Sequence, residues 1–386
     1  MPAGRPAIGG TGAAVTLGPV TQTPVAHVLP GAEPAPHRGS ARSVASPAAD
    51  TSTPPTAVDT PRTAVDLVRP PRETAAPGAR AGLRATVLAY VALTKPRIIE
   101  LLLVTTVPAM VLAADGWPGW QVLVATLVGG TFAAGSANAL NCYLDRDIDA
   151  LMRRTGHRPL VRSAGRPVVS PRAALVFGWV LAAVSLAVMA TTTWLATALT
   201  AVAIAFYTVV YTMLLKRRTA QNIVWGGAAG CLPVLIGWAA VTGSLSWAAV
   251  ALFAVVFFWT PPHFWSLVMR YRDDYARAGV PMLPVVAGPV TVARQIVVYT
   301  WLTVAASLAV WPLSSHLSWL YGVLAGGAGA LLLVAAHRML AGVRRDVDGS
   351  GGVSGPSVAA PMRLFHLSNS YLAFVFVAVA LDVLVR

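Results

Sequence analysis

Nine long apolar runs, separated by polar loops of which two are long, restrict what this chain can fold into more than any other feature of its sequence. A helix needs about 20 predominantly apolar residues to cross the hydrocarbon core of a bilayer. The runs lie at 98–114, 120–140, 173–192, 194–215, 222–241, 245–268, 293–313, 319–340 and 368–385. The sequence therefore predicts an all-α, polytopic membrane protein with about nine transmembrane helices.

The segment before the first run has a different composition. Residues 1–89 contain no Phe, Trp or Tyr, and Tyr90 is the first aromatic residue of the chain. A segment rich in Pro, Ala, Thr and Ser cannot bury enough apolar surface to offset its ordering entropy, and it lacks the compact apolar core of a secretory signal. We predict a disordered tail at 1–89 and a transmembrane domain at 90–386; a start codon assigned too far upstream would also account for part of the tail.

The distribution of basic residues predicts the orientation of the chain. A net charge of +14 would suit nucleic acid, but the cations lie in short loops between apolar runs, so we expect a lipid bilayer as the partner and no nucleic acid. The loops after runs one, three, five and seven contain no Lys or Arg, whereas those after runs two, four, six and eight are basic. This asymmetry predicts a multi-pass protein of the cell membrane, with a cytoplasmic N-terminus and Arg386 outside.

A polar face follows the second run, where the run reaches the predicted membrane surface. Asn141, Asp145 and Asp149 are spaced i, i+4, i+8, so a continuing helix would place them on one face, with Asp147 on another. Carboxylates at membrane depth are costly and usually functional. Mg²⁺ suits such a face, because it takes one or two carboxylates and completes its shell with phosphates and water. The alternative is that these residues are surface charges anchoring a helix end.

Arginines follow this face directly and could hold phosphate oxygens through bidentate hydrogen bonds: they are Arg153, Arg154 and Arg158. A second acidic pair, Asp273 and Asp274, follows the sixth run on the same predicted side, beside Arg270. Two acidic clusters interleaved with arginine fit a diphosphate held through metal and cations, which would stabilise the charge of a departing diphosphate. The apolar bundle behind them suits an isoprenoid chain.

The stretch N-x-x-x-D-x-x-x-D at 141–149 resembles the first signature of the UbiA-type intramembrane prenyltransferases. Further stretches are similar to the protoheme IX farnesyltransferase branch of that family, and together the resemblance covers about residues 93–382. These stretches are RRTGHRPLV, YTVVYTMLLKRRTAQNIVWGGAAGCLPVLIGW, PPHFW, DDYARAGVPMLPV and MRLFHLSNSYLAFVFVAVALD.

The resemblance implies a helical bundle around a central cavity and a reaction that depends on Mg²⁺. The farnesyl group of farnesyl diphosphate would pass to a vinyl group of protoheme IX, with addition of water, giving heme O and diphosphate. Direct contact with heme A synthase or a terminal oxidase assembly is a further partner that this product would suit. Transfer to an aromatic quinone precursor is the rival within the family, and a transporter is the rival from another class.

The resemblance also assigns roles to residues. Asn141, Asp145 and Asp149 form the first catalytic motif, and Asp274 lies in the second with Asp273 beside it. Asp145, Asp149 and Asp274 are the implied metal ligands. The wider family has D-x-x-x-D at the second motif, but the residues four positions after Asp273 and Asp274 are Arg277 and Ala278. The second cluster is therefore expected to bind diphosphate partly through arginine.

Five further residues are candidates for substrate binding. Lys216 and Arg217 match the basic pair after the fourth run and would contact diphosphate, or only set the topology. Tyr207 and Tyr211 share a face at i, i+4, where they would line the cavity or pack in the interior. His263, in the proline-broken stretch TPPH, would contact the iron or propionates of heme, or form an interior hydrogen bond.

Overall fold

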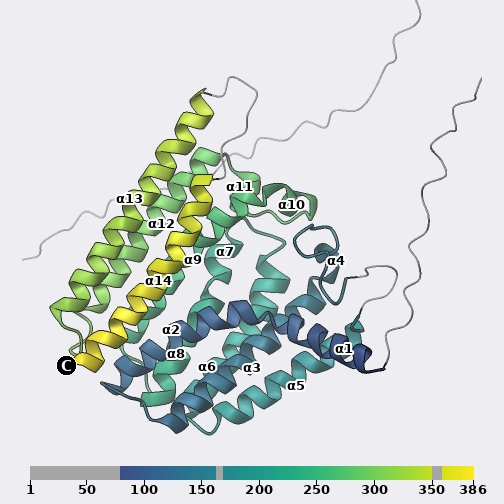
Figure 1. Cartoon of the computed structure of the whole chain (residues 1–386), viewed down its shortest axis with the longest axis horizontal. Helices are drawn as coiled ribbons and strands as arrows, with labels where there is room; N and C mark the ends of the chain where they lie inside the picture. Colours follow the sequence, from purple (N-terminus) through teal and green to yellow (C-terminus); the bar gives the residue numbers. More distant parts are fainter. Residues whose placement is uncertain (1–78, 162–167, 350–358) are drawn as a thin grey trace, which may run out of the picture. The chain divides into compact units, whose positions relative to one another are not determined.

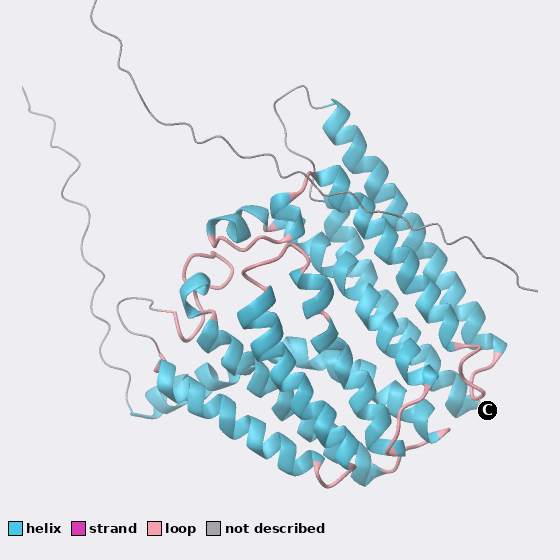
Figure 2. Ribbon diagram, turned by 180° about the vertical axis from the view of Figure 1, so that it is seen from behind, coloured by secondary structure: helices cyan, strands magenta, loops and turns pink. Residues whose placement is uncertain are grey.

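The structure is a computed structural model that describes residues 79–161, 168–349 and 359–386, with side chains described from Leu83 onward except those at 97–103. Within these residues every regular element is a helix (Figures 1 and 2). The elements are α1 (Ala79–Thr94), α2 (Pro96–Ala114), α3 (Trp120–Leu144), α4 (Arg146–Asp149), α5 (Pro171–Met189), α6 (Trp194–Ala205), the π-helix η1 (Phe206–Leu215), α7 (Asn222–Gly226), α8 (Ala228–Thr242), α9 (Trp247–Arg270), α10 (Arg272–Arg277), α11 (Leu283–Val286), α12 (Pro289–Val310), α13 (Trp319–Gly349) and α14 (Ala359–Val385).

The predicted all-α membrane fold is confirmed. Among the described residues, eight helical stretches are long and apolar enough to cross a membrane. Two of them are composite, since α6 continues into η1 over Trp194–Leu215 and α7 continues into α8 over Asn222–Thr242. The predicted run at 98–114 lies in α2, whose apolar part is described from Val104 to Ala114.

The start of the bundle differs from the sequence prediction. Most of the predicted tail, residues 1–78, lies outside the described residues, but 79–89 belong to α1. Leu93 of this helix is fully buried and packs with Ala139 of α3. The helix begins 11 residues before its aromatic residue, Tyr90, so a boundary drawn at the first aromatic residue placed the start of the helix too late.

Helix packing divides the bundle into two regions. The largest buried cluster lies among α9, α12, α13 and α14, where α12 packs against both α9 and α13. The other region contains α3, which packs mainly against α5, and α8, which packs against α2 and α6. The short helices α4, α10 and α11 gather at one end of the bundle (Figure 1). The ends of α3 and α9, which carry the two acidic clusters, therefore meet at the same end.

Candidate active site

The predicted polar face at the end of α3 is present. The helix ends at Leu144 and α4 begins at Arg146, but two backbone bonds maintain the helical register: Asp145 N–H to Asn141 O at 2.9 Å and Asp149 N–H to Asp145 O at 2.8 Å. The side chains of Asn141, Asp145 and Asp149 are consequently all buried, Asp145 completely. Asp147 points elsewhere, with 60% of its side chain exposed.

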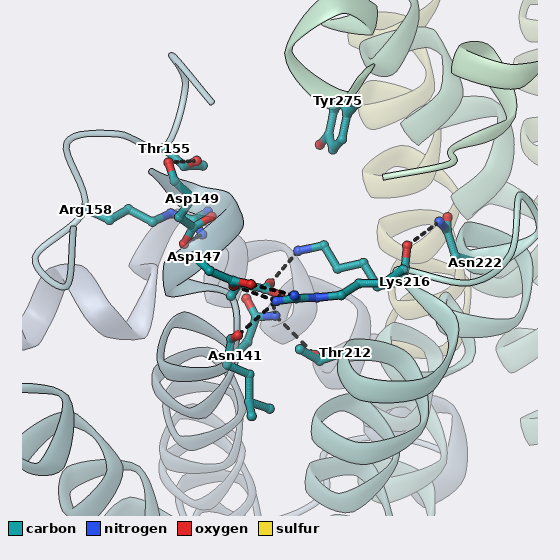
Figure 3. Close-up of polar contacts among 12 residues, drawn as sticks. Asn141, Asp147, Asp149, Thr155, Arg158, Thr212, Lys216, Asn222 and Tyr275 are labelled. Atoms are coloured by element: carbon teal, nitrogen blue, oxygen red, sulfur yellow. Dashed lines mark hydrogen bonds and ion pairs between the residues drawn. The ribbon is translucent and has the colours of Figure 1, made fainter. Parts of the chain in front are cut away.

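Cations from η1 and from the loop after α4 neutralise these carboxylates. Lys216 donates a hydrogen bond to Asp145 Oδ2, and Arg217 lies 3.7 Å from Asp145 Oδ1. Arg158 donates to Asp149 Oδ2 at 2.6 Å. Lys216 reaches from η1 toward the turn after α3 (Figure 3). The site thus combines buried oxygen acceptors with ion-paired cationic side chains, a composition that suits a diphosphate bound through metal and cations.

Arg217 also holds the exposed carboxylate. Its two terminal nitrogens donate to Asp147 at 2.6 and 2.7 Å. The hydrogen bond from Arg217 lowers the pKa of Asp147 to about 2. Arg217 therefore contacts two carboxylates, the exposed one of Asp147 and the buried one of Asp145.

Lys95 belongs to this site, although the sequence analysis did not select it. Its Nζ donates to Asn141 Oδ1 at 2.8 Å, and burial lowers the pKa of this ammonium to about 8. Lys95 has a left-handed backbone, with φ 53°, directly before Pro96. Such a conformation is uncommon for a residue with a side chain and tends to occur at functional sites. The turn between α1 and α2 directs the Lys95 side chain toward Asn141.

The second acidic cluster lies at the end of α9 and in α10. Asp274 is buried and pairs with Arg277 one turn later in the same helix, whereas Asp273 and Arg270 are exposed. Within the described residues, neither aspartate forms a hydrogen bond to the first cluster. The contact between the two regions is instead made by Arg154, whose guanidinium donates to the Tyr275 hydroxyl at 3.1 Å. Arg153 is exposed on the same loop.

Tyr275 was not predicted as a site residue. It is buried, burial raises the pKa of its hydroxyl, and Arg154 also lies 5.9 Å from the centre of its ring. Figure 3 shows Tyr275 directed from its helix toward the loop that carries Asp149 and Arg158. A tyrosine next to two aspartates gives no periodic signal, so only the tertiary contact identifies it.

An apolar cavity of about 150 Å³ lies behind the polar face. Tyr207 and Asn138 line it close to that face, and Thr126 and Ile236 line it farther along α3 and α8. Tyr207 and Tyr211 do share a face, with ring centroids 5.4 Å apart. Tyr211 fits because residue 226 is glycine: a Cβ there would lie 2.1 Å from the ring carbon Cδ2 of Tyr211.

His263 lies in α9, away from the acidic clusters. Its ring is stacked between Trp259, at 4.2 Å between ring centroids, and Phe365 of α14, at 4.4 Å. Nδ1 lies 2.9 Å from the Ser368 hydroxyl. Ser368 Oγ itself donates to the Phe365 carbonyl at 2.8 Å, so the histidine nitrogen must be the donor in the first bond.

Comparison with known proteins identifies the family. The profile described as the UbiA prenyltransferase family matches residues 102–350. The chain belongs to the UbiA prenyltransferase family. UbiA-family relatives at high identity include Protoheme IX farnesyltransferase 1 of Saccharopolyspora erythraea, 58% identical over 80% of this chain and 94% of the relative. Protoheme IX farnesyltransferase of Nocardioides sp. is 57% identical over 78% of this chain and 93% of the relative.

Solved structures show that the UbiA fold extends over most of the chain. A structure of digeranylgeranylglyceryl phosphate synthase has a TM-score of 0.62 at 15% identity and covers 78% of this chain and 99% of its own. A UbiA homolog from Archaeoglobus fulgidus, bound to DMAPP and Mg²⁺, has a TM-score of 0.54 at 18% identity, covering 75% and 99%. At these identities the likeness concerns the fold.

The residues of this UbiA-family site fit a hard metal ion. Asn141, Asp145 and Asp149 offer oxygen donors on one face, and Asp145 Oδ1 is buried with no hydrogen-bond partner. In the described part of the chain, no group of three or more His, Cys, Asp or Glu residues could alone hold a metal. A site with few protein ligands that completes its shell with substrate oxygens is typical of Mg²⁺.

Proposed function

We propose that this UbiA-family enzyme transfers the farnesyl group of farnesyl diphosphate to a vinyl group of protoheme IX, with addition of water, and produces heme O and diphosphate. The observation that carries the proposal is the set of relatives named protoheme IX farnesyltransferase, which are 57–58% identical over more than nine-tenths of their length. The geometry supports the diphosphate half of this reaction directly, through the buried carboxylates and the cations around them.

The diphosphate binds between the end of α3 and the end of η1. In this proposal Asn141, Asp145 and Asp149 would hold Mg²⁺ there. Asp274 would act on the diphosphate from α10 together with Arg277, because the described residues contain no cluster of three carboxylates that could share one metal. When bound, Mg²⁺ would neutralise diphosphate oxygens and so favour their departure. Lys216, Arg217, Arg154, Arg158 and Lys95 supply positive charge to the phosphates, and Arg153, Arg270 and Asp273 form the outer, exposed rim. All of these residues lie in the proposed transmembrane domain at 90–386.

The reaction requires charge stabilisation rather than a nucleophilic side chain. The bond between C1 and oxygen of farnesyl diphosphate breaks with both electrons leaving on the diphosphate, so positive charge develops on C1. The π electrons of the vinyl group form the new carbon–carbon bond to C1. Water then adds to the resulting cation and releases a proton to solvent. Lys216 and Arg158 stabilise the growing negative charge of the leaving group.

The apolar cavity receives the first part of the farnesyl chain, because a void of about 150 Å³ holds a benzene-sized group and is too small for the whole chain. It opens beside Tyr207, close to the proposed diphosphate site, and its lining is almost entirely apolar, with small residues such as Ala133, Ala134 and Gly130. Small side chains leave room for methyl branches, and burial of an isoprenoid chain is favourable at about 25 cal/mol per Å² of apolar surface. Tyr207 lines the polar end of this cavity, and Tyr211 packs against Tyr207.

His263 is the residue that we expect to bind heme iron. Because Nδ1 carries the proton that it donates to Ser368, Nε2 is unprotonated and has a free lone pair, the form in which histidine ligates a metal. Trp259 and Phe365 hold the ring plane from both sides. A hydrogen bond donated by the other ring nitrogen is a regular feature of histidines that bind a metal.

A His263→Ala variant is expected to bind protoheme about 10-fold more weakly and to lose the absorbance spectrum of a histidine-ligated heme. The measurement is a titration of the purified protein with hemin, followed at the Soret band, with added imidazole as a rescue. His337→Ala is the matched control, because His337 is exposed on α13. An unchanged spectrum and affinity in His263→Ala would return His263 to a purely structural role.

The location and partners follow from the same proposal. The acidic clusters face the cytoplasm of a cell-membrane protein whose N-terminus is cytoplasmic and whose C-terminus is outside, because basic loops flank this end of the bundle. Heme O is too apolar to leave the bilayer, so direct contact with heme A synthase or a terminal oxidase assembly would favour its transfer.

The first experiment is mass spectrometry of hemes extracted from a bacterial host that lacks heme O and expresses this chain. We expect a protoheme adduct that carries farnesyl plus water, and its absence when Asp145→Ala replaces the wild type. Membrane insertion of both proteins is verified by immunoblot. If the inserted wild-type chain forms no adduct, the acceptor assignment is wrong, and quinone precursors and then transport become the hypotheses to test.

A further inference from the structure

The π-helix η1, which ends just before Lys216, directs three side chains toward the active site. In a regular α-helix these three side chains would point to different sides. In an α-helix, nine residues make about two and a half turns, so Tyr207 and Lys216 would point to opposite sides. In η1 the bonds run from residue i to i+5, as in Lys216 N–H to Tyr211 O at 2.8 Å, and nine residues make about two turns. Tyr207 lines the cavity while Lys216 contacts Asp145.

Thr212 lies between them and contacts the first motif. Asn141 Nδ2 donates to Thr212 Oγ1 at 3.1 Å, and Thr212 Oγ1 donates to the Tyr207 carbonyl at 2.8 Å. Thr212 is 1% exposed. The hydroxyl hydrogen is therefore committed to the carbonyl of η1, and its lone pair is available only as an acceptor for the asparagine.

The remaining bonds of Asn141 all require the same amide orientation. Its Nδ2 also donates to Asp145 Oδ2 at 2.7 Å, so both amide hydrogens are used. Oδ1 accepts from Lys95, which has only donors to offer. The carbonyl oxygen of Asn141 is thus the atom presented toward Lys95, while the amide nitrogen faces Asp145 and Thr212.

We infer that Thr212 is a positioning residue of the active site: held by the π-helical turn, it fixes the Asn141 amide with its oxygen toward the metal and diphosphate. The inference rests on the proposed function, because it assigns Asn141 to that metal. Lys95 reaches Asn141 with the end of a long side chain, whereas Thr212 is held by the bond to the Tyr207 carbonyl within its own helix. Thr212 is consequently the partner of Asn141 whose position the backbone fixes.

The test uses the full chain purified in detergent, with Mn²⁺ as the metal and farnesyl thiodiphosphate as an unreactive substrate. Free Mn²⁺ is measured by electron paramagnetic resonance for wild type, Thr212→Val and Thr212→Ser. We expect Thr212→Val to weaken Mn²⁺ binding about 10-fold, the usual effect of removing a residue that orients a metal ligand. Thr212→Ser, which keeps the hydroxyl, should restore affinity close to that of wild type.

Thr208→Val is the matched control. Thr208 is buried in the same π-helix, but its hydroxyl donates to the Ile204 carbonyl of its own helix, at 2.7 Å. We expect wild-type Mn²⁺ affinity in this variant. Wild-type affinity in Thr212→Val, or an equal loss in Thr208→Val, would overturn the inference.

A double-mutant cycle with Asn141→Ala tests the route of the effect. If Thr212 acts through Asn141, Thr212→Val should cause no further loss of Mn²⁺ affinity in the Asn141→Ala background. Additive losses would overturn the inference. The proposed function is tested separately: a wild-type chain that shows this Mn²⁺ pattern but forms no heme O would contradict the function and leave the role of Thr212 intact.

Discussion

An Asp145→Asn variant is expected to lose prenyl transfer by about three orders of magnitude, equivalent to about 4 kcal/mol of transition-state stabilisation. Asp145 is fully buried, and its Oδ2 accepts hydrogen bonds from Asn141 and Lys216. The amide keeps the shape of the side chain but removes the charge that would balance a metal. The rate of heme O formation, divided by the amount of inserted protein, measures the effect.

The asparagine variant separates a loss of activity from a loss of folding better than Asp145→Ala does. Both substitutions remove the negative charge beside the Lys216 ammonium, which is 13% exposed, but the asparagine carbonyl can still accept its hydrogen bond. Alanine leaves the ammonium without an acceptor, which adds a loss of folding free energy. Asp147→Asn is the matched control, because Asp147 lies two residues away and its side chain is 60% exposed and paired with Arg217 rather than buried in the site. Near-wild-type rates in Asp145→Asn would remove the metal-site hypothesis; an equal loss in Asp147→Asn would indicate a general charge effect.

The part of the fold that the sequence predicted well depends on strong local periodicity. Each apolar run became a helix, because a long stretch without charges has few alternatives in a bilayer. The i, i+4, i+8 spacing correctly predicted that Asn141, Asp145 and Asp149 lie together, because the hydrogen-bond register of α3 continues through Asp145 into α4.

The residues that escaped prediction are those whose position depends on tertiary contacts or on an unusual backbone. Lys95 reaches Asn141 only because a left-handed residue joins α1 to α2. Thr212 faces Asn141 only because η1 is a π-helix, and the hydropathy of its sequence does not distinguish a π-helix from an α-helix. Tyr275 is identified only by its contact with Arg154.

The second acidic cluster falls between these cases. Its location at the end of α9 agrees with the prediction, but its pairing is local, since Asp274 binds Arg277 within α10. Three residues apart on one helix, these two side chains are neighbours. Arg277 occupies the position four after Asp273 where the wider family has an aspartate. An arginine there neutralises Asp274, which supports an arginine contribution to diphosphate binding at this end.

A Lys216→Met variant is expected to reduce kcat by about 10²–10³-fold, or about 2.7–4 kcal/mol, the usual effect of removing one donor that stabilises developing negative charge. Lys216 donates to the fully buried Asp145, and its backbone carbonyl is held by Asn222 at 3.1 Å. The ammonium is thus positioned beside the proposed leaving group before reaction. Steady-state kinetics with farnesyl diphosphate and protoheme would give kcat and KM separately.

Arg218→Met is the matched control for Lys216→Met. Arg218 is exposed, two residues later in the same loop, so the substitution removes the same unit charge from the same end of the bundle. A charge that only sets membrane topology should give similar, small effects at the two positions, with correct insertion as the sensitive readout. A large fall in kcat for Lys216→Met alone, with insertion intact, requires that Lys216 acts on the transition state. Equal behaviour of the two variants would reduce Lys216 to a topological charge and leave Arg158 and Arg217 as the cations that stabilise the departing diphosphate.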